Sequence, residues 1–85
     1  MSNESTYTGT VQSVEYKGTT RNGNSRYTVT LYSEELGVQV ITDTTAPDSH
    51  AGLVAAGTRE GDRVTITVGK RGITALENHA ERFNH

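Results

Sequence analysis

The chain has 85 residues, a formal net charge of −2 and no cysteine. A chain of this length folds as one domain with a thin core, and the lack of cysteine excludes a disulfide framework or a cysteine-ligated zinc site. Threonine and valine recur, tyrosine appears four times and proline once, which is a composition that suits half-buried strands. The weak negative charge gives no global attraction to nucleic acid or to an anionic membrane, so any such binding must be local.

The start of the chain, "MSNEST", lacks the basic and apolar regions of a secretory signal, and no apolar run is long enough to span a bilayer. The sequence therefore predicts a cytoplasmic protein that does not contact a membrane. Residues 1–5 are polar and are predicted to be disordered, residues 6–78 to form the folded domain, and residues 79–85 to form a C-terminal tail.

Residues 7–16 are rich in strand formers and predict a first strand. Val11 and Val14 lie three positions apart, which would place them on opposite faces of a regular strand. We therefore predict a β-bulge near Gln12 and Ser13 that turns both valines inward.

Residues 17–25, "KGTTRNGNS", are predicted to form a mobile loop in which Gly23 supplies a positive φ. The following residues alternate between two faces and predict a second strand. The faces consist of Tyr27, Val29 and Leu31 on one side and Thr28, Thr30 and Tyr32 on the other. After a turn at Gly37, residues 38–43 predict a third strand. Ile41 is predicted to point outward beside Tyr32, where it either adds a second contact or lies beneath the helix.

The pattern changes at "TTAPDSHAGLVAAG", where Thr45 begins a stretch that resembles an acidic capping box. We predict a short helix over residues 46–56, with Leu53 and Val54 in the core and Gly57 as a left-handed cap. The next segment, "RVTITVGKRGITALEN", alternates apolar residues with threonine and turns at "GKRG", which predicts the fourth and fifth strands.

Three strands, a short helix and two strands, with a long bulged first strand, resemble the OB-fold superfamily of small single-domain oligonucleotide-binding-type barrels. The segment "TGTVQSVEYKG" is similar to the first strand of such domains, and "EGDRVTITVGKRG" is similar to the fourth. The resemblance covers residues 6–78. It implies a mostly β fold, a five-stranded Greek-key OB-like barrel with one short helix between strands 3 and 4.

In this superfamily the ligand lies on the outer face of strands two and three, flanked by the loops that join strands one to two and four to five. Five basic residues fall in or beside these two loops: Lys17, Arg21, Arg26, Lys70 and Arg71. The resemblance implies that they meet phosphates, while Tyr32, alone or together with Tyr27 or Tyr16, stacks on a base. We therefore expect a non-catalytic module without a cofactor that binds single-stranded nucleic acid weakly and with little sequence preference.

The same cations also have an ordinary role, because basic side chains keep hairpin loops soluble. Four acidic residues lie nearby in the sequence and are placed to neutralise them: Glu15, Glu34, Glu35 and Asp43. The alternative function is a protein-interaction or assembly adaptor that uses the barrel rim or a strand edge, with Ile41 and Leu36 as contacts. Whether the chain forms a homo-oligomer and whether it prefers DNA or RNA stay open at this point.

The histidines suggest neither a metal site nor a catalytic site. The segment "ENHAERFNH" holds four residues of the types that bind metals: Glu77, His79, Glu81 and His85. A tail does not supply the rigid, convergent geometry that a metal site requires. Ser49 beside His50 belongs to the first turn of the predicted helix and has no orienting carboxylate. We therefore predict that the protein is not an enzyme.

Overall fold

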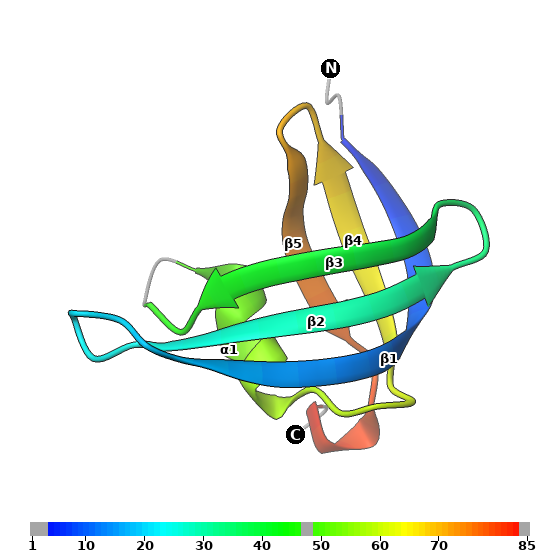
Figure 1. Cartoon of the computed structure of the whole chain (residues 1–85). Coiled ribbons are helices and arrows are strands. Elements are labelled where there is room, and N and C mark those ends of the chain that lie inside the picture. The colour runs from blue at the N-terminus through cyan, green and yellow to red at the C-terminus, as the bar shows by residue number, and fades with distance from the viewer. Residues whose placement is uncertain (1–3, 47–48, 84–85) are drawn as a thin grey trace.

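The computed structural model describes residues 4–46 and 49–83. Five strands form one antiparallel sheet that curls into a half-barrel, with a short helix packed on its inner side (Figure 1). The elements are β1 (Ser5–Thr19), β2 (Ser25–Ser33), β3 (Gly37–Thr44), α1 (His50–Gly57), β4 (Arg63–Gly69), β5 (Gly72–Asn78) and a 3₁₀ turn, η1 (Glu81–Phe83). The predicted mostly β fold, with five strands and one helix between the third and fourth, is confirmed.

The strand order is β3-β2-β1-β4-β5, so β1 lies at the centre of the sheet. Its first half pairs with β4 and its second half pairs with β2. Because the β2–β3 and β4–β5 hairpins attach to different halves of one long strand, they run in crossed directions and the sheet bends around the core (Figure 1). In the part of the chain that the structure describes, no ladder joins the edge strands β3 and β5, and α1 contacts both.

The predicted bulge in β1 is present, because the pairing with β2 passes directly from Val11 to Ser13 and skips Gln12. The extra residue changes the parity of the strand, as a bulge should. Val11 is buried, and Val14 packs against the core from a partly buried position. Both valines therefore face inward despite their odd separation.

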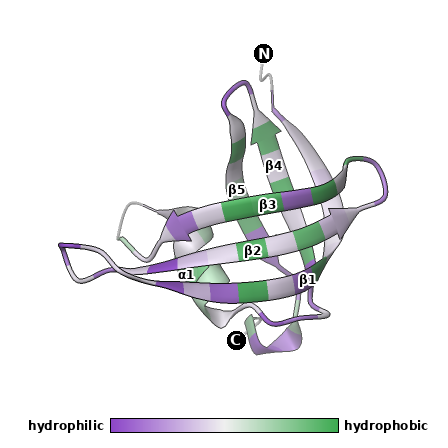
Figure 2. Ribbon diagram, in the orientation of Figure 1, coloured by the Kyte–Doolittle hydropathy of each residue, from purple (hydrophilic) through white to green (hydrophobic). Residues whose placement is uncertain are grey.

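The core is a single cluster of buried apolar side chains between the sheet and α1. Its members are Val11, Val29, Leu31, Ile41, Ala51, Ala55, Val64, Ile66 and Leu76. Figure 2 shows hydrophobic segments along the middle of the strands and hydrophilic residues at the outer end of the β1–β2 hairpin and at the β4–β5 turn. The core thus holds the centre of the sheet and leaves the two hairpin ends in water.

The prediction that Ile41 points outward is wrong, because its side chain is 7% exposed and lies in the core. The β2–β3 turn has three residues between Ser33 and Gly37, and this length pairs Val29 with Ile41. Residues directly opposite each other in a ladder share a face, so Ile41 joins the buried Val29. The outward residues of β3 are instead Val38 and Val40, each 57% exposed.

The predicted start of the helix is also wrong. The helix begins at His50, and the Ser49 hydroxyl caps it by accepting a hydrogen bond from the Gly52 N–H at 3.0 Å. Thr45 does not cap the helix, because its hydroxyl accepts a hydrogen bond from the Ser25 N–H at 3.0 Å. Its own N–H donates to Ser25 O at 2.8 Å and extends the β2–β3 ladder. The predicted first turn at residues 47 and 48 lies outside the described residues.

The face of α1 that packs on the sheet differs from the prediction as well. Ala51 and Ala55 are buried and Val54 is partly buried, whereas Leu53 is 54% exposed. Small residues face the sheet because the helix lies very close to it. Gly57 does not adopt a positive φ, so the predicted left-handed cap is absent and the helix ends at Gly57 in right-handed geometry.

Candidate nucleic-acid interface

The outer part of the β1–β2 hairpin, residues 16–27, is called the β1–β2 arm. The ladder continues to the pair Thr19 and Ser25, so the turn spans only residues 20–24. Thr20 N–H donates to Asn24 O at 2.8 Å and closes this turn. The predicted loop over residues 17–25 is therefore too long, because residues 17–19 and 25 belong to the paired strands and only residues 20–24 form the turn, in which Gly23 adopts the predicted positive φ.

The three cations of the β1–β2 arm are placed by this ladder. Lys17 occupies a second bulge of β1, Arg21 lies in the turn, and Arg26 lies on β2. Lys17 Nζ is 3.3 Å from Glu15 Oε2, and both side chains are largely in water, so the pair is weak. Arg21 and Arg26 are exposed and form no ion pair within residues 4–46 and 49–83.

The other two predicted cations, Lys70 and Arg71, form the two-residue turn between β4 and β5. Gly69 and Gly72 face each other at the end of the ladder, and Gly72 adopts a positive φ of 99°. That conformation disfavours any residue other than glycine. Both basic side chains are exposed and, among the described residues, have no ion-pair partner.

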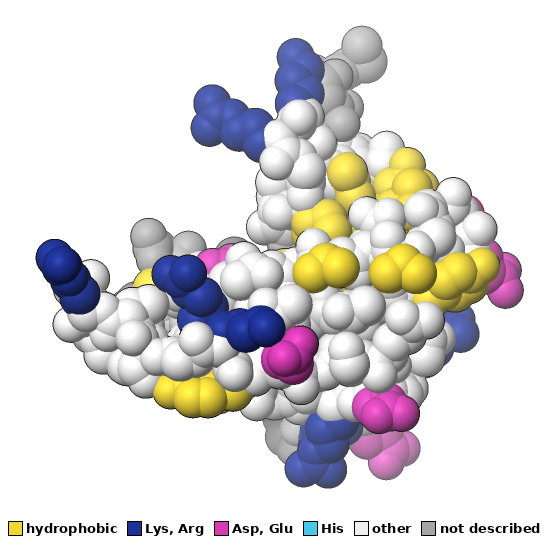
Figure 3. Space-filling view, in the orientation of Figure 1, with side chains coloured by type: hydrophobic (Ala, Val, Ile, Leu, Met, Phe, Trp, Pro, Cys, Tyr) yellow, Lys and Arg dark blue, Asp and Glu magenta, His cyan; other side chains and the backbone are white. Residues whose placement is uncertain are grey.

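Figure 3 shows how the two cationic hairpins are arranged. Lys and Arg side chains gather over the β1–β2 arm and, separately, over the β4–β5 turn. In this view the surface is indented between the two groups, and no Lys or Arg side chain of the described residues lies between them. We call this indentation the interhairpin notch. A polyanion lying in it has positive charge at each end.

Tyr32 is exposed, as its position in the alternation predicts, but it lies away from the cations. It pairs with Val38 beside the β2–β3 turn, six residues from Arg26 along β2. At about 3.3 Å per residue the two positions are about 20 Å apart. Tyr32 instead lines a pocket of about 310 Å³ with Glu34, Glu35 and Arg63. The two carboxylates there outnumber the single guanidinium, which disfavours phosphate.

The aromatic side chains nearest the cations are Tyr16 and Tyr27, at the base of the β1–β2 arm. They face each other across the ladder with ring centroids 5.6 Å apart and planes inclined by 58°. Such a tilted pair is a favourable aromatic geometry. Tyr16 is 58% exposed and shares a 2.5 Å hydrogen bond with the Thr19 hydroxyl, so one ring is held in place with its face accessible.

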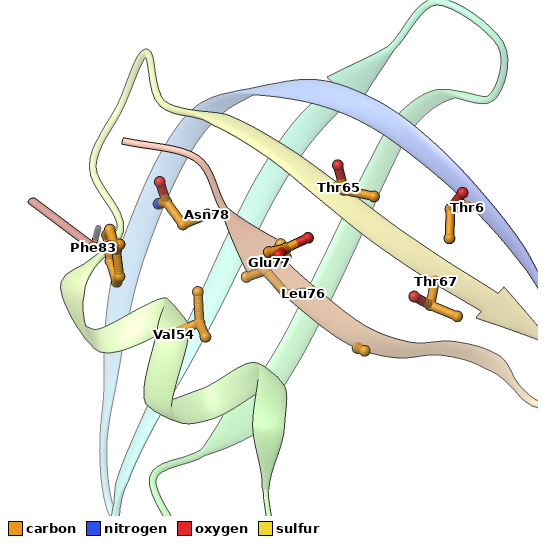
Figure 4. A pocket seen from close by; sticks show the side chains of 9 residues that line it. Thr6, Val54, Thr65, Thr67, Leu76, Glu77, Asn78 and Phe83 are labelled. Atoms are coloured by element: carbon orange, nitrogen blue, oxygen red, sulfur yellow. The ribbon is translucent and has the colours of Figure 1, made fainter. Parts of the chain in front are cut away.

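A groove with a volume of about 540 Å³ lies over β5 (Figure 4). Val54, Leu76 and Phe83 line its side toward α1, and Thr65, Thr67 and Glu77 line the side toward β4. Its described lining contains a carboxylate and no basic side chain. This chemistry does not suit an anionic polymer, so the groove is separate from the candidate interface.

A polar cluster at the opposite end of β4 from Lys70 and Arg71 was not predicted from the sequence. Arg82 donates two hydrogen bonds to the Asp62 carboxylate and also reaches the Gly57 carbonyl at 2.9 Å. Buried Asn78 donates to Asp62 Oδ2 at 3.0 Å. The hydrogen bond from Arg82 is the main reason that the pKa of Asp62 falls from 3.8 to about 2. The cluster fastens η1 to α1 and β4.

The histidines do not form a metal site within the described residues. His79 lies beside Thr65, with 2.6 Å between Nε2 and Oγ1, and His85 lies outside the described residues. Within residues 4–46 and 49–83, no three His, Cys, Asp or Glu side chains are grouped to hold a metal ion. None of the described helices has the length and apolar character needed to cross a membrane.

A scan against protein-family models and searches of curated proteins and of solved structures gave no match for this chain.

Proposed function

We propose that the protein is a non-catalytic module of the OB-fold type that binds single-stranded nucleic acid through the interhairpin notch. The observation that carries this proposal is the position of the five cations on two hairpins that flank one indentation. Both hairpins are paired up to their turns, so the backbone that carries the cations is in place before a ligand arrives. Preorganised cations attract phosphates without the cost of ordering a loop.

Base stacking supplies the second part of the interaction. Tyr16 is exposed and is supported by Tyr27 on the same arm that carries Lys17, Arg21 and Arg26. An aromatic face binds any base, so the expected recognition is tolerant of sequence. Tyr32 contributes less on this proposal, because Glu34 and Glu35 lie beside it.

Salt dependence tests the proposal directly. Single strands lose affinity with a slope of about −0.7 per phosphate contact in a plot of log K against log salt, so five contacts give a slope of about −3.5. The measurement is fluorescence anisotropy of a labelled oligothymidylate titrated with the protein from 50 to 200 mM salt. A flat salt dependence, or no binding at the lowest salt, contradicts the proposal.

Charge reversal then tests the location of the site. The double variant R21E/K70E should abolish oligonucleotide binding and leave the thermal melt unchanged, because both side chains are exposed and unpaired among the described residues. The matched control is R59E/R63E, which makes the same charge change at exposed positions at the other end of β4. If R21E/K70E retains its affinity for the oligonucleotide, the interhairpin notch is not the site. If R59E/R63E loses as much affinity as R21E/K70E, the loss comes from the change in net charge and not from the position of the cations.

A second candidate function is a protein-binding adaptor, and one observation favours it. Val38 and Val40 are each 57% exposed and lie on the same face of the sheet as Tyr32. Adjacent exposed apolar side chains on an edge strand are typical of a surface that meets another polypeptide.

A further inference from the structure

The free side of β3 carries backbone groups that no other described strand pairs. β3 is an edge of the sheet, and Thr45 N–H donates to Ser25 O just beyond its end. Hydrogen-bonding direction alternates along an antiparallel pair, so this bond fixes the odd-numbered residues of β3 as those that face β2. The N–H and C=O groups of Val38, Val40 and Thr42 therefore point away from the sheet.

Side chains satisfy backbone groups at both ends of this free side. Gln39 Nε2 donates to the Val38 carbonyl at 3.0 Å, and the Thr44 N–H donates to Asp43 Oδ1 at 2.8 Å. The stretch between them, residues 38–42, is called the β3 edge window. It is long enough for the pairing of one short strand.

The β3 edge window lacks the usual protection of an edge strand. From Gly37 to Thr44 there is no lysine, arginine or proline, and the pairing with β2 is regular. α1 contacts both edge strands, but the pairing of β5 with β4 has a register shift that the pairing of β3 with β2 lacks. Natural sheets protect edges by such irregularity, so the regular edge of β3 is the better suited to pairing.

The exposed charged residues at the two ends of the β3 edge window differ in sign. Glu34 and Glu35 are exposed in the turn before β3, whereas exposed Arg26 pairs with Thr44 at its end. Asp43 is also at that end, but it is half-buried, alternates to the opposite face of β3 from Thr44 and accepts a hydrogen bond from the Thr44 N–H. A nucleic acid strand along this edge would meet the two carboxylates. A peptide with opposite charges at its two ends meets complementary charge at both.

We propose that the β3 edge window binds an extended segment of a partner protein, which adds to the sheet as a sixth strand antiparallel to β3. Its N-terminal end lies beside Arg26 and is acidic, its middle is β-branched and covers Val40, and its C-terminal end lies beside Glu34 and is basic. The backbone supplies affinity and the charges set direction. This inference deepens the protein-binding candidate, rests on that candidate alone and is independent of nucleic-acid binding.

A second copy of the chain is the competing occupant of the β3 edge window. The β4–β5 hairpin crosses behind β3 and extends past its free side (Figure 1). A single extended strand takes up only about 5 Å in the plane of the sheet. It therefore has more room beside this hairpin than a second half-barrel has.

Two peptides of identical composition test the proposal. EEVTVTVKK has the proposed order of charge and KKVTVTVEE has the reverse. Each is titrated into the isotope-labelled full chain, with amide exchange measured by NMR. EEVTVTVKK should slow exchange at Val38, Val40 and Thr42 and bind about fivefold tighter, since a few weak ion pairs give an effect of that size. Equal affinities, or no protection at these amides, overturn the proposal.

A proline at the edge separates strand addition from other binding. V40P removes an N–H that points away from β2, so the ladder is retained, and it should weaken EEVTVTVKK about tenfold. V40T retains the donor and should bind as the natural chain does. T42P tests the same edge if V40P melts early. Unchanged peptide binding in a folded proline variant overturns the proposal, as does self-association that V40P abolishes, because the occupant is then a second copy.

The same variants distinguish this inference from nucleic-acid binding. V40P should retain oligonucleotide affinity, and R21E/K70E should retain the preference for EEVTVTVKK. A variant that loses oligonucleotide binding but still binds the peptide is therefore consistent with the peptide site. Displacement of the peptide from the β3 edge amides by oligothymidylate would assign the edge to nucleic acid and overturn the proposal.

Discussion

Gly52 shows how one missing side chain determines where α1 lies. A Cβ at this position would fall 1.7 Å from the Thr44 carbonyl oxygen, a distance that no side chain tolerates. The close contact brings the start of α1 against the end of β3. Glycine within a helix costs about 1 kcal/mol relative to alanine, but here only glycine permits this close packing of the helix on the sheet.

Alanine at Gly52 should therefore lower the free energy of unfolding by about 3 kcal/mol, because backbone must move to admit the methyl group. The matched control is G57A, in which the new Cβ meets only the ring of Phe83, 2.9 Å away at the end of a side chain that can shift. G57A should be nearly neutral. Urea unfolding followed by circular dichroism measures both, and equal stabilities would contradict the close-packing argument.

Asp62 makes stability depend on pH in acid. Its pKa is about 2 in the folded chain against 3.8 ordinarily, and a difference of one corresponds to about 1.4 kcal/mol. The ionised group therefore stabilises the fold by about 2 kcal/mol above pH 4. Because the folded pKa is the lower one, this contribution is lost as pH falls from about 4 to about 2.

D62N should be less stable than the natural chain by about 2 kcal/mol at pH 7, and the difference should shrink between pH 4 and pH 2. Denaturant titrations at several pH values measure it. E60Q removes a neighbouring exposed carboxylate and should leave the curve unchanged. If the difference in stability between D62N and the natural chain stays constant down to pH 2, the loss of stability comes from altered packing and not from the lost charge.

At the scale of elements, the β1–β2 arm combines aromatic and cationic side chains on one paired ribbon. Tyr16 is supported by Tyr27 near Lys17 and Arg26, whereas Tyr32 stands at the other end of β2 beside carboxylates. The same residue type therefore has two different surroundings on one hairpin. If the protein binds nucleic acid as proposed, this difference predicts different roles for the two tyrosines.

Y16A should weaken binding of a labelled oligothymidylate by about tenfold, since the loss of one stacked base costs about 1–3 kcal/mol. Y32A should change it less than twofold. Anisotropy titrations at one low salt concentration compare the two variants, and thermal melts check that each is folded. A larger loss in Y32A than in Y16A would move the stacking site to the β2–β3 end.

Strands could be predicted from the sequence better than the junctions between them. Strict alternation in β2 and β4, and the odd spacing of Val11 and Val14, depend on local backbone geometry, so the strands and the bulge were predicted correctly. The facing of Ile41 depends on the number of residues in the β2–β3 turn, which alternation does not give. The start of α1 was missed because Thr45 joins a ladder with Ser25, a partner distant in sequence.

The candidate site was predicted only in part for the same reason. Lys70 and Arg71 lie between two glycines, a local turn signal, and they form that turn. The separation of Tyr32 from Arg26 follows from the length of β2. The Asp62 cluster joins η1 to the start of β4. These segments are distant in sequence, so no local sequence pattern predicts the contact.

At the scale of the whole molecule, the two cationic hairpins lie on a body whose longest dimension is 35 Å. A ligand must therefore be long enough to reach from one hairpin to the other. OB-fold modules, the class proposed for this chain, cover about 4–16 nucleotides, and this is the range of oligonucleotide length to test. The salt dependence of binding grows with the number of phosphates that are contacted, so a ligand that reaches both hairpins should show a steeper dependence than one that reaches a single hairpin.

An oligothymidylate of about 4 nucleotides should reach one hairpin and give a salt slope of about −1.4 to −2.1, for two or three contacts. One of about 16 nucleotides should give the full slope of about −3.5. Anisotropy across a length series measures the change. In R21E/K70E the slope should not grow with length, and a natural chain whose slope is independent of length would argue for a single binding hairpin.

The two ends of the described chain have different surroundings, and this affects how the protein is handled. Glu4 accepts a 3.1 Å hydrogen bond from Thr74 on β5, near Lys70 and Arg71, whereas η1 is fastened beside Gly57 at the other end of the molecule (Figure 1). An affinity tag or fluorophore joined at the N-terminal side would crowd the β4–β5 cations. Immobilisation through the C-terminal side leaves them open to a ligand in solution.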